Sequence, residues 1–332
     1  LRVGNRGDLA DLFAKQKWQA PEADPDVLNQ AYVVAPLGAG PSGGLAAAGF
    51  GEGPSARAYL GASYALAELV RRLDVQDGQW AFVLDAAPVT ASPAVAGRTL
   101  YHMNCFNASR GLSLDFMTPE EIEDYVDFLV DARYSRVSFF QWRDYYLYPG
   151  NAEGRRVENE RIARLMRHFC RYARRRGLEA YQMVTPSHIH ARAFLDDPAC
   201  IGKTTTPDPL DDTGFLFYQA CCWSRPEARA VARATMRRHM EYYGPLDGYC
   251  VWFWDPGGCF CDDCARHQAD RIFDQFTTIV ELAQGISPGA RFEASLWPTW
   301  AFPNFKEYGL PFTTDEANQI ARDFLDKARG LS

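Results

Sequence analysis

The 332-residue sequence has little lysine, no excess of positive charge and no long apolar run. Lysine is so scarce that nearly all positive charge is arginine, from which we infer no function. The 35 Lys and Arg residues against 42 Asp and Glu give a net charge of −7, so there is no global basic field to attract nucleic acid or an anionic membrane surface. No stretch approaches the ~20 consecutive apolar residues of a membrane-spanning helix. We therefore expect neither a nucleic acid nor a membrane as partner.

Several common functional motifs are also missing. There is no G-x-G-x-x-G after a strand, no G-x4-G-K-[ST] and no G-x-S-x-G, so nucleotide-binding and serine-hydrolase functions lack their usual marks. We expect no organic cofactor. The sequence begins at Leu1 without a charged and then apolar leader, which is compatible with a removed signal peptide or with a fragment. The chain has nine cysteines, an odd number in a chain too long to need disulfides for stability. This count does not decide whether the protein works in an oxidising or a reducing compartment.

The composition that is present indicates a folded protein with a sizeable core, since 47% of residues are hydrophobic and 14% are aromatic. At roughly 150 residues per domain, the length suggests about two domains. Residues 1–95 predict a small noncatalytic α+β domain. Its expected elements are a strand at 31–34, a Gly/Pro/Ala-rich loop up to Gly53, a helix at about 55–73, a strand at 80–84 and a linker at 87–97.

After Arg98 the pattern changes to strict alternation of short apolar strands and amphipathic helices, which is typical of parallel β/α units. The expected strands cover 99–106, 136–142, 178–185, 248–255 and 292–297, and the expected helices cover 119–133, 158–175, 225–243, 265–284 and 314–329. Three helix starts have the capping-box form, at Thr118, Ser224 and Thr313. A closed barrel needs eight such units. Either the chain is cut off before a sixth strand or the fold is an open α/β sheet, and the polar and aromatic residues at the strand ends favour the first option. We therefore predict that residues 98–332 form a TIM-type (β/α) barrel that is incomplete, with about five β/α units and truncation at the C-terminus.

Polar and aromatic side chains gather where the predicted strands end. The active face of such a barrel lies at the carboxyl ends of its strands. Flat aromatic rings can stack on the C–H faces of sugars, while amide, guanidinium and imidazole groups can bond sugar hydroxyls. The predicted substrate-binding residues are Asn104, Asn107, Gln141, Trp142, Arg143, Tyr145, His188, Trp254, Trp297 and Trp300.

Asp255 is the strongest candidate for acid catalysis. It follows an apolar strand, and its neighbours Phe253 and Trp254 would partly desolvate the carboxyl group, which raises its pKa and keeps it protonated as a proton donor. A simpler alternative is that Asp255 only caps the turn before Gly257. Hydrolysis of glycosides normally needs two carboxyl groups, and Asp144 is the candidate for the second.

Cys259, Cys261 and Cys264 form a C-x-C-x2-C cluster that could converge on one tetrahedral metal ion. Thiolates suit zinc, and a site made of cysteines leaves no open position for catalytic water, so we expect a structural zinc. The fourth ligand is open between His267, Cys105, Cys221 and Cys222. A Cys259–Cys264 disulfide, or plain reduced thiols, are the alternatives.

Two stretches carry a resemblance to known enzymes. The segment from Tyr59 to Leu73, followed by Val83–Asp85 and Gly97–Tyr101, resembles the junction in β-N-acetylhexosaminidases and xylan-degrading α-glucuronidases, in which a small α+β domain precedes a (β/α)8 barrel. The Asp255–Cys264 segment is similar to the zinc-binding loop of one group of β-galactosidases. The resemblance implies a glycosidase, although the hexosaminidases have an Asp-Glu pair where this chain has Asp255-Pro256.

These observations together predict a glycoside hydrolase that acts on a terminal sugar of a glycan, as in polysaccharide degradation. The alternative is a noncatalytic carbohydrate-binding protein or an inactive barrel fragment. A zinc-dependent hydrolase is a weaker third hypothesis, because the cysteine cluster offers no open coordination position. Association of identical chains into a homo-oligomer is left open by the sequence.

Overall fold

The computed structural model describes residues 2–37, 44–76, 78–83, 87–95, 97–103, 114, 117–140, 153–187, 189, 191–194, 196–203, 221–253, 259–295 and 313–331. The chain divides into two compact units. The first comprises Leu1–His102, Phe116–Ser138 and Arg167–Ala180, and the second comprises Met103–Asp115, Phe139–Met166 and Tyr181–Ser332. The domain boundary predicted near residue 96 stays a prediction.

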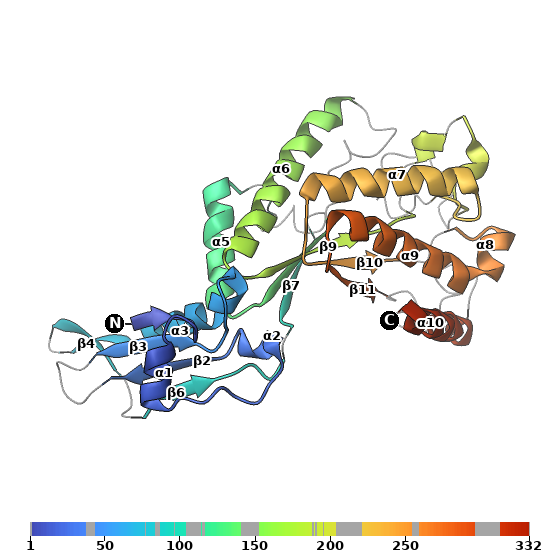
Figure 1. Cartoon of the computed structure of the whole chain (residues 1–332). Coiled ribbons are helices and arrows are strands. Elements are labelled where there is room, and N and C mark those ends of the chain that lie inside the picture. Colours follow the sequence, from blue (N-terminus) through green and yellow to red (C-terminus); the bar gives the residue numbers. More distant parts are fainter. Residues whose placement is uncertain are drawn as a thin grey trace. The chain divides into compact units, whose positions relative to one another are not determined.

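The first unit contains a four-stranded mixed sheet in the order β1-β3-β2-β6 (Figure 1). Strand β3 runs parallel to β1 and antiparallel to β2, which in turn is antiparallel to β6. A separate hairpin pairs β4 with β5. The strands are β1 (Arg2–Gly4), β2 (Tyr32–Pro36), β3 (Leu45–Gly49), β4 (Leu73–Gln76), β5 (Gln79–Phe82) and β6 (Val89–Ala91), and the α-helices that accompany them are α1 (Ala10–Gln16), α2 (Pro25–Leu28) and α3 (Leu60–Arg71).

Two predictions for this unit are wrong. The stretch predicted as loop up to Gly53 contains β3, whose Leu45-Ala-Ala-Ala-Gly49 sequence has no alternation of polar and apolar residues because the strand is buried almost throughout. Its small side chains serve close packing, since a Cβ added to Gly49 would lie 2.5 Å from the backbone nitrogen of Ala62 on α3. The predicted linker at 87–97 likewise contains the short strand β6.

The second sheet contains five strands in the order β11-β10-β9-β8-β7, so that sequence neighbours are also neighbours in space (Figure 1). Strand β10 pairs in parallel with both β9 and β11. The strands are β7 (Thr99–Met103), β8 (Arg136–Phe140), β9 (Glu179–Val184), β10 (Gly248–Trp252) and β11 (Arg291–Ser295), and the helices that follow them are α5 (Pro119–Asp131), α6 (Glu153–Arg175), α7 (Pro226–Tyr243), α8 (Asp262–Arg266) with α9 (Gln268–Ile286), and α10 (Thr314–Ala328).

The predicted alternation of strands and helices is therefore confirmed over five β/α units. The chain is an α/β protein with a parallel sheet and an α+β part. Within the described residues the five strands form an open sheet, and no closed barrel is seen. The predicted single helix at 265–284 is divided, because α8 ends at Arg266 and α9 begins at Gln268.

The helix starts show which capping predictions were correct. The side chains of Thr118 and Thr313 each accept a hydrogen bond from the backbone N–H three residues later. The carboxylates of Glu121 and Glu316 accept the backbone N–H of Thr118 and Thr313 in turn, so both capping boxes are confirmed. The box predicted at Ser224 is wrong. Helix α7 begins one residue later, with Arg225 as N-cap and no side-chain capping bond.

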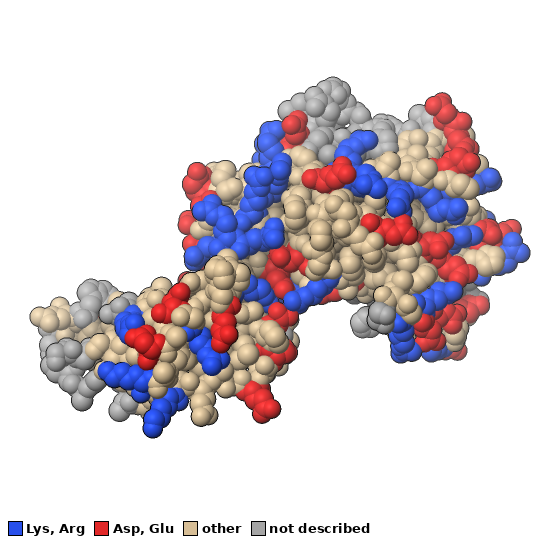
Figure 2. Space-filling model, in the orientation of Figure 1, with Lys and Arg blue, Asp and Glu red and all other residues tan. Residues whose placement is uncertain are grey.

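The surface carries mixed charge. Figure 2 shows acidic and basic side chains intermingled over the face in view, with arginines gathered along α6. Some of this charge is paired locally, as in the 3.0 Å contact between Arg164 and Glu160 one helical turn apart, which is typical of a solvated helix face. Among the described helices, none combines the length and apolar character needed to cross a bilayer.

Candidate metal centre

The predicted sugar-binding and acid residues cannot be placed. Asp255 and Asp144, together with Asn104, Asn107, Gln141, Trp142, Arg143, Tyr145, His188, Trp254, Trp297 and Trp300, lie outside the described residues. Their roles stay predictions. The three predicted metal ligands are described, and they are found together.

Four cysteines form one cluster in the second unit, namely Cys222, Cys259, Cys261 and Cys264. Their sulfur atoms all lie within 4.8 Å of one another, and the Cys222 Sγ lies 3.7 Å from that of Cys261 and 4.0 Å from that of Cys264. Four sulfurs bound at about 2.3 Å to one tetrahedral zinc ion would be about 3.8 Å apart. The cluster could therefore hold one metal ion.

Backbone amides point at these sulfurs. The Cys259 Sγ accepts hydrogen bonds from the N–H of Lys203 at 3.2 Å and from the N–H of Cys261 at 3.4 Å. The Cys261 Sγ caps α8 by accepting the N–H of Cys264 at 3.5 Å. Hydrogen bonds to a sulfur favour its thiolate form, which is the form that binds a metal. The local backbone thus favours negative charge at the sulfurs of Cys259 and Cys261.

The thiols also influence one another in the metal-free cluster. Hydrogen bonds from the thiols of Cys259 and Cys264 lower the pKa of Cys222 well below its usual range. The same sharing raises the pKa of Cys259 and raises that of Cys264 to about 12, in each case chiefly through the hydrogen bond to Cys222 and with burial adding to the effect. Hydrogen bonding among the thiols thus shifts their pKa values in opposite directions. A divalent cation can replace the thiol protons.

The structure decides between the candidates for the fourth metal ligand that it describes. Cys222 supplies the fourth sulfur. His267 lies half-exposed, with its Nδ1 3.1 Å from the carbonyl oxygen of Asp263, and is not among the clustered ligand atoms. Cys221 is fully buried outside the cluster, and Cys105 lies outside the described residues. A Cys259–Cys264 disulfide is absent, because all eight described cysteines are free.

The hydroxyl of Ser224 contacts the cysteine cluster, which its sequence pattern did not suggest. Its Oγ lies 3.0 Å from the Cys222 Sγ and 3.8 Å from the Cys261 Sγ, so the hydroxyl expected to cap α7 is directed at the sulfurs instead. The turn that carries both residues is fixed by a bond of 3.0 Å from the Arg225 N–H to the Cys222 carbonyl. Nothing in the local sequence distinguishes Cys222 from its neighbour Cys221 as the fourth ligand.

Phe253 anchors the end of β10. It is buried, and its ring packs edge-on against Phe324 of α10 with centroids 5.5 Å apart. The ring is thus committed to the helix that covers this strand.

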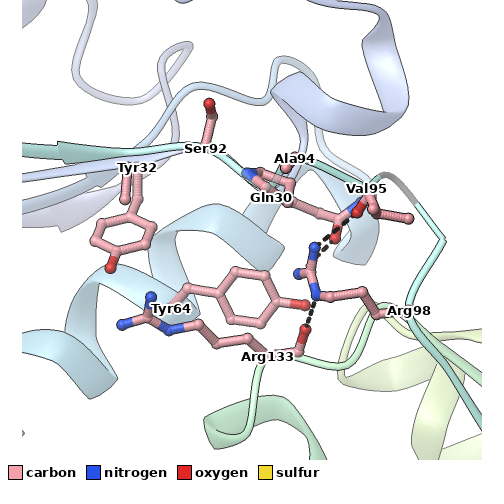
Figure 3. A pocket seen from close by; sticks show the side chains of 10 residues that line it. Gln30, Tyr32, Tyr64, Ser92, Ala94, Val95, Arg98 and Arg133 are labelled. Atoms are coloured by element: carbon pink, nitrogen blue, oxygen red, sulfur yellow. Dashed lines mark hydrogen bonds between the residues drawn. The ribbon is translucent and has the colours of Figure 1, made fainter.

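The first unit contains a separate cavity of about 310 Å³ beside Tyr64 and Arg98 (Figure 3). All three guanidinium nitrogens of Arg98 already donate hydrogen bonds, to the Gln30 side chain at 2.8 Å and to the carbonyls of Val95 and Arg133 at 2.9 and 2.6 Å. The Tyr64 hydroxyl donates to the Tyr134 carbonyl, and burial raises its pKa. The Arg98 guanidinium and the Tyr64 hydroxyl are thus held by hydrogen bonds to residues of the first unit.

Comparison with known proteins relates the fold to one group of enzymes. No family model and no curated protein sequence matches the chain. Solved structures do match, among them a chitobiase from Flavobacterium johnsoniae (TM-score 0.54, 10% identity, 81% of this chain and 40% of that one). Others are a β-N-acetylhexosaminidase from Bacteroides fragilis (TM-score 0.53, 11% identity, 96% and 68%) and a glycoside hydrolase family 20 β-N-acetylglucosaminidase (TM-score 0.52, 15% identity, 90% and 61%).

These similarities establish a fold like that of glycoside hydrolase family 20. The chain spans between 40% and 68% of the length of these three structures. The part of the expected resemblance that concerns hexosaminidases is thus supported at the level of the fold. The parts that concern α-glucuronidases and the zinc loop of β-galactosidases stay predictions.

Proposed function

We propose that the protein is a glycoside hydrolase that removes a terminal sugar from a glycan, with Asp255 as proton donor. The observation that supports this most is the family 20-like fold, because three enzymes that share it are described as a chitobiase, a β-N-acetylhexosaminidase and a β-N-acetylglucosaminidase. The predicted sugar-binding residues follow the strands of the parallel sheet in the sequence. In such folds the carboxyl ends of the strands carry the catalytic groups.

The order of the strands is compatible with a pair of carboxyl groups. Asp144 follows β8 in the sequence and Asp255 follows β10, with β9 alone between these strands. At about 4.8 Å per strand, β8 and β10 are about 10 Å apart. Paired carboxyl groups in glycosidases are separated by about 5–9.5 Å, a range that side chains converging from two such strands can reach. Asp255 would protonate the leaving oxygen, while Asp144 would act on the opposite side of the sugar ring.

The test is turnover of a panel of aryl glycosides that includes an N-acetyl-β-glucosaminide. Asp255→Asn should lower kcat on the matched substrate by roughly 10²–10⁴-fold, the range expected for loss of a general acid. Asp262→Asn, which removes an exposed carboxyl group nearby in the chain, should leave the rate unchanged. An Asp255→Asn variant as active as the wild type would contradict the assignment. Sugar binding without turnover of any glycoside would instead indicate a noncatalytic carbohydrate-binding protein.

We further propose that the metal held by the four cysteines is zinc in a structural role. Tetrahedral four-sulfur sites bind zinc or iron. Zinc is the usual metal of structural sites with four cysteine ligands, and its filled d shell imposes no other coordination geometry. With four protein sulfurs as ligands, no position is open for water or substrate. Metal analysis of protein purified without chelators should find one zinc per chain. A coloured protein that contains iron would overturn the choice of metal.

A further inference from the structure

The cysteine cluster lies where three segments of the chain meet. Backbone hydrogen bonds join the first segment, Cys200–Lys203, to both of the others: the Cys222 N–H donates to the Cys200 carbonyl at 2.8 Å, and the Phe260 N–H donates to the Lys203 carbonyl at 2.7 Å. An isolated antiparallel bridge between Ile201 and Cys221 adds to the first contact. Residues 200–203 are therefore hydrogen-bonded to both of the segments that supply the sulfurs.

Each of the two segments that supply sulfurs lies at the end of a connection between a strand and the next helix. The connection after β9 runs from Val184 to α7 and carries Cys222 close to its end. The connection after β10 runs from Trp252 to α8 and carries Cys259 and Cys261 close to its end. Between strand and sulfur, the first connection contains His188 and the second contains Trp254 and Asp255. The cluster is thus a point at which the two connections meet after leaving adjacent parallel strands.

Among the described residues, the direct buried contact between these two segments is made by sulfurs. It consists of Cys222, Cys259 and Cys264 with the half-buried Cys261 packed against them, and none of the members described there is a large apolar side chain. Four small thiols bury little apolar area, so their packing alone stabilises this contact only weakly. A metal ion would replace this weak contact with four bonds.

We propose that the metal is a crosslink between Cys222, near the end of the connection after β9, and Cys259, Cys261 and Cys264, which end the connection after β10 and begin α8. The choice of these connections as substrate-bearing rests on the proposed glycosidase function, whereas the crosslink itself does not. The four cysteines are positioning residues in this scheme. They act on the chemistry only by holding the chain segments that carry the predicted sugar-binding and acid residues.

Hydrogen exchange on the full chain, followed by mass spectrometry, tests the crosslink without any substrate. Removing the metal from the wild-type protein should speed amide exchange in residues 198–203, 221–225 and 259–264 together, by at least about tenfold. Amides of β2 and β3 in the first unit should not change, which separates local release from general unfolding. Unchanged exchange, or a change in only one of the two connections, would overturn the crosslink.

Variants give the matched comparison. Cys222→Ser should reduce the metal content and reproduce the fast exchange, whereas Cys221→Ala, which removes the adjacent buried thiol outside the cluster, should keep both at the wild-type level. Compared with Cys222→Ser, the Cys222→His variant should bind the metal again and show amide exchange as slow as in the wild type, because imidazole is also a zinc ligand. If Cys222→Ser does not fold, metal removal from the wild type and the histidine variant still decide the question.

The outcomes separate the two proposals. Fast exchange after metal removal in a protein that cleaves no glycoside would leave the crosslink standing and contradict the proposed function. In an active enzyme the crosslink predicts that metal removal raises KM for the aryl glycoside together with the exchange rates. Turnover, KM and exchange that are all unaffected by metal removal would leave the function standing and overturn the crosslink.

Discussion

The sulfur atoms of Cys222 and Cys261 lie 3.7 Å apart although the residues are separated by 39 positions in the sequence. The distance matches the edge of a tetrahedron of sulfurs around one zinc ion, about 3.8 Å. Cys222 reaches this place because the chain turns into α7 directly after it. Cys261 reaches it because its sulfur caps α8. The site is therefore built from the starts of two helices that follow neighbouring strands.

Ser224 should matter for the metal and Thr118 should not. Removing a group that supports a metal ligand typically lowers affinity by roughly 10–100-fold, so Ser224→Ala should weaken metal binding by about tenfold with little loss of helix stability. Thr118→Ala removes a true N-cap and should cost about 1 kcal/mol in the free energy of unfolding while metal affinity stays the same. Competition titration with a metal indicator and denaturant unfolding measure the two quantities. The reverse pattern would show that the Ser224 hydroxyl caps α7 after all.

Metal binding should weaken as the pH falls. Each thiol must lose its proton to bind, and the raised pKa of Cys264, about 12 without metal, shows how strongly the proton competes. The metal-bound state holds fewer protons than the metal-free state, so acid favours release and alkali favours retention. Metal remaining after dialysis against a weak chelator at a series of pH values gives the midpoint. His267→Ala should leave that midpoint unchanged, whereas a shifted midpoint would implicate His267 as a ligand.

Glu179 should be important for stability in the first unit. Its carboxylate is buried between two guanidinium groups, 3.1 Å from the Nε of Arg136 and 3.5 Å from the Nη2 of Arg57. Glu179→Gln keeps the shape but removes a buried negative charge that faces two mostly buried guanidinium groups, and should cost about 3 kcal/mol in the free energy of unfolding. Glu281→Gln breaks an exposed bridge to Arg233 and should cost less than about 1 kcal/mol. Equal losses in urea unfolding of the two variants would contradict this distinction.

The sequence predicted the β/α alternation well because each helix carries its own local signals. Helix α5 begins at a capping box, and Ile122, Val126 and Leu129, which recur at helical spacing, are buried. Strand β3 was missed because close packing against a helix selects alanine and glycine, which give no periodic signal. The predicted cap at Ser224 failed since nearby sulfurs offered its hydroxyl another partner, a contact that local sequence does not record.

The candidate site was predictable in part for the same reason. Cys259, Cys261 and Cys264 are close in the sequence, so their convergence follows from local geometry. The fourth ligand was left open among four residues because distance along the chain does not determine distance in space; the parallel pairing of β9 with β10 brings the segment of Cys222 to the cluster. Asp255 and the aromatic residues remain predictions from their places after the strands.

Diffraction from crystals of the full chain at the zinc absorption edge tests the central claim most directly. We predict one anomalous peak, about 2.3 Å from the Sγ atoms of Cys222, Cys259, Cys261 and Cys264. The peak should disappear just below the edge, which distinguishes zinc from other scatterers. A disulfide between any two of these cysteines, or four sulfurs with no peak among them in protein purified with zinc present, would contradict the account.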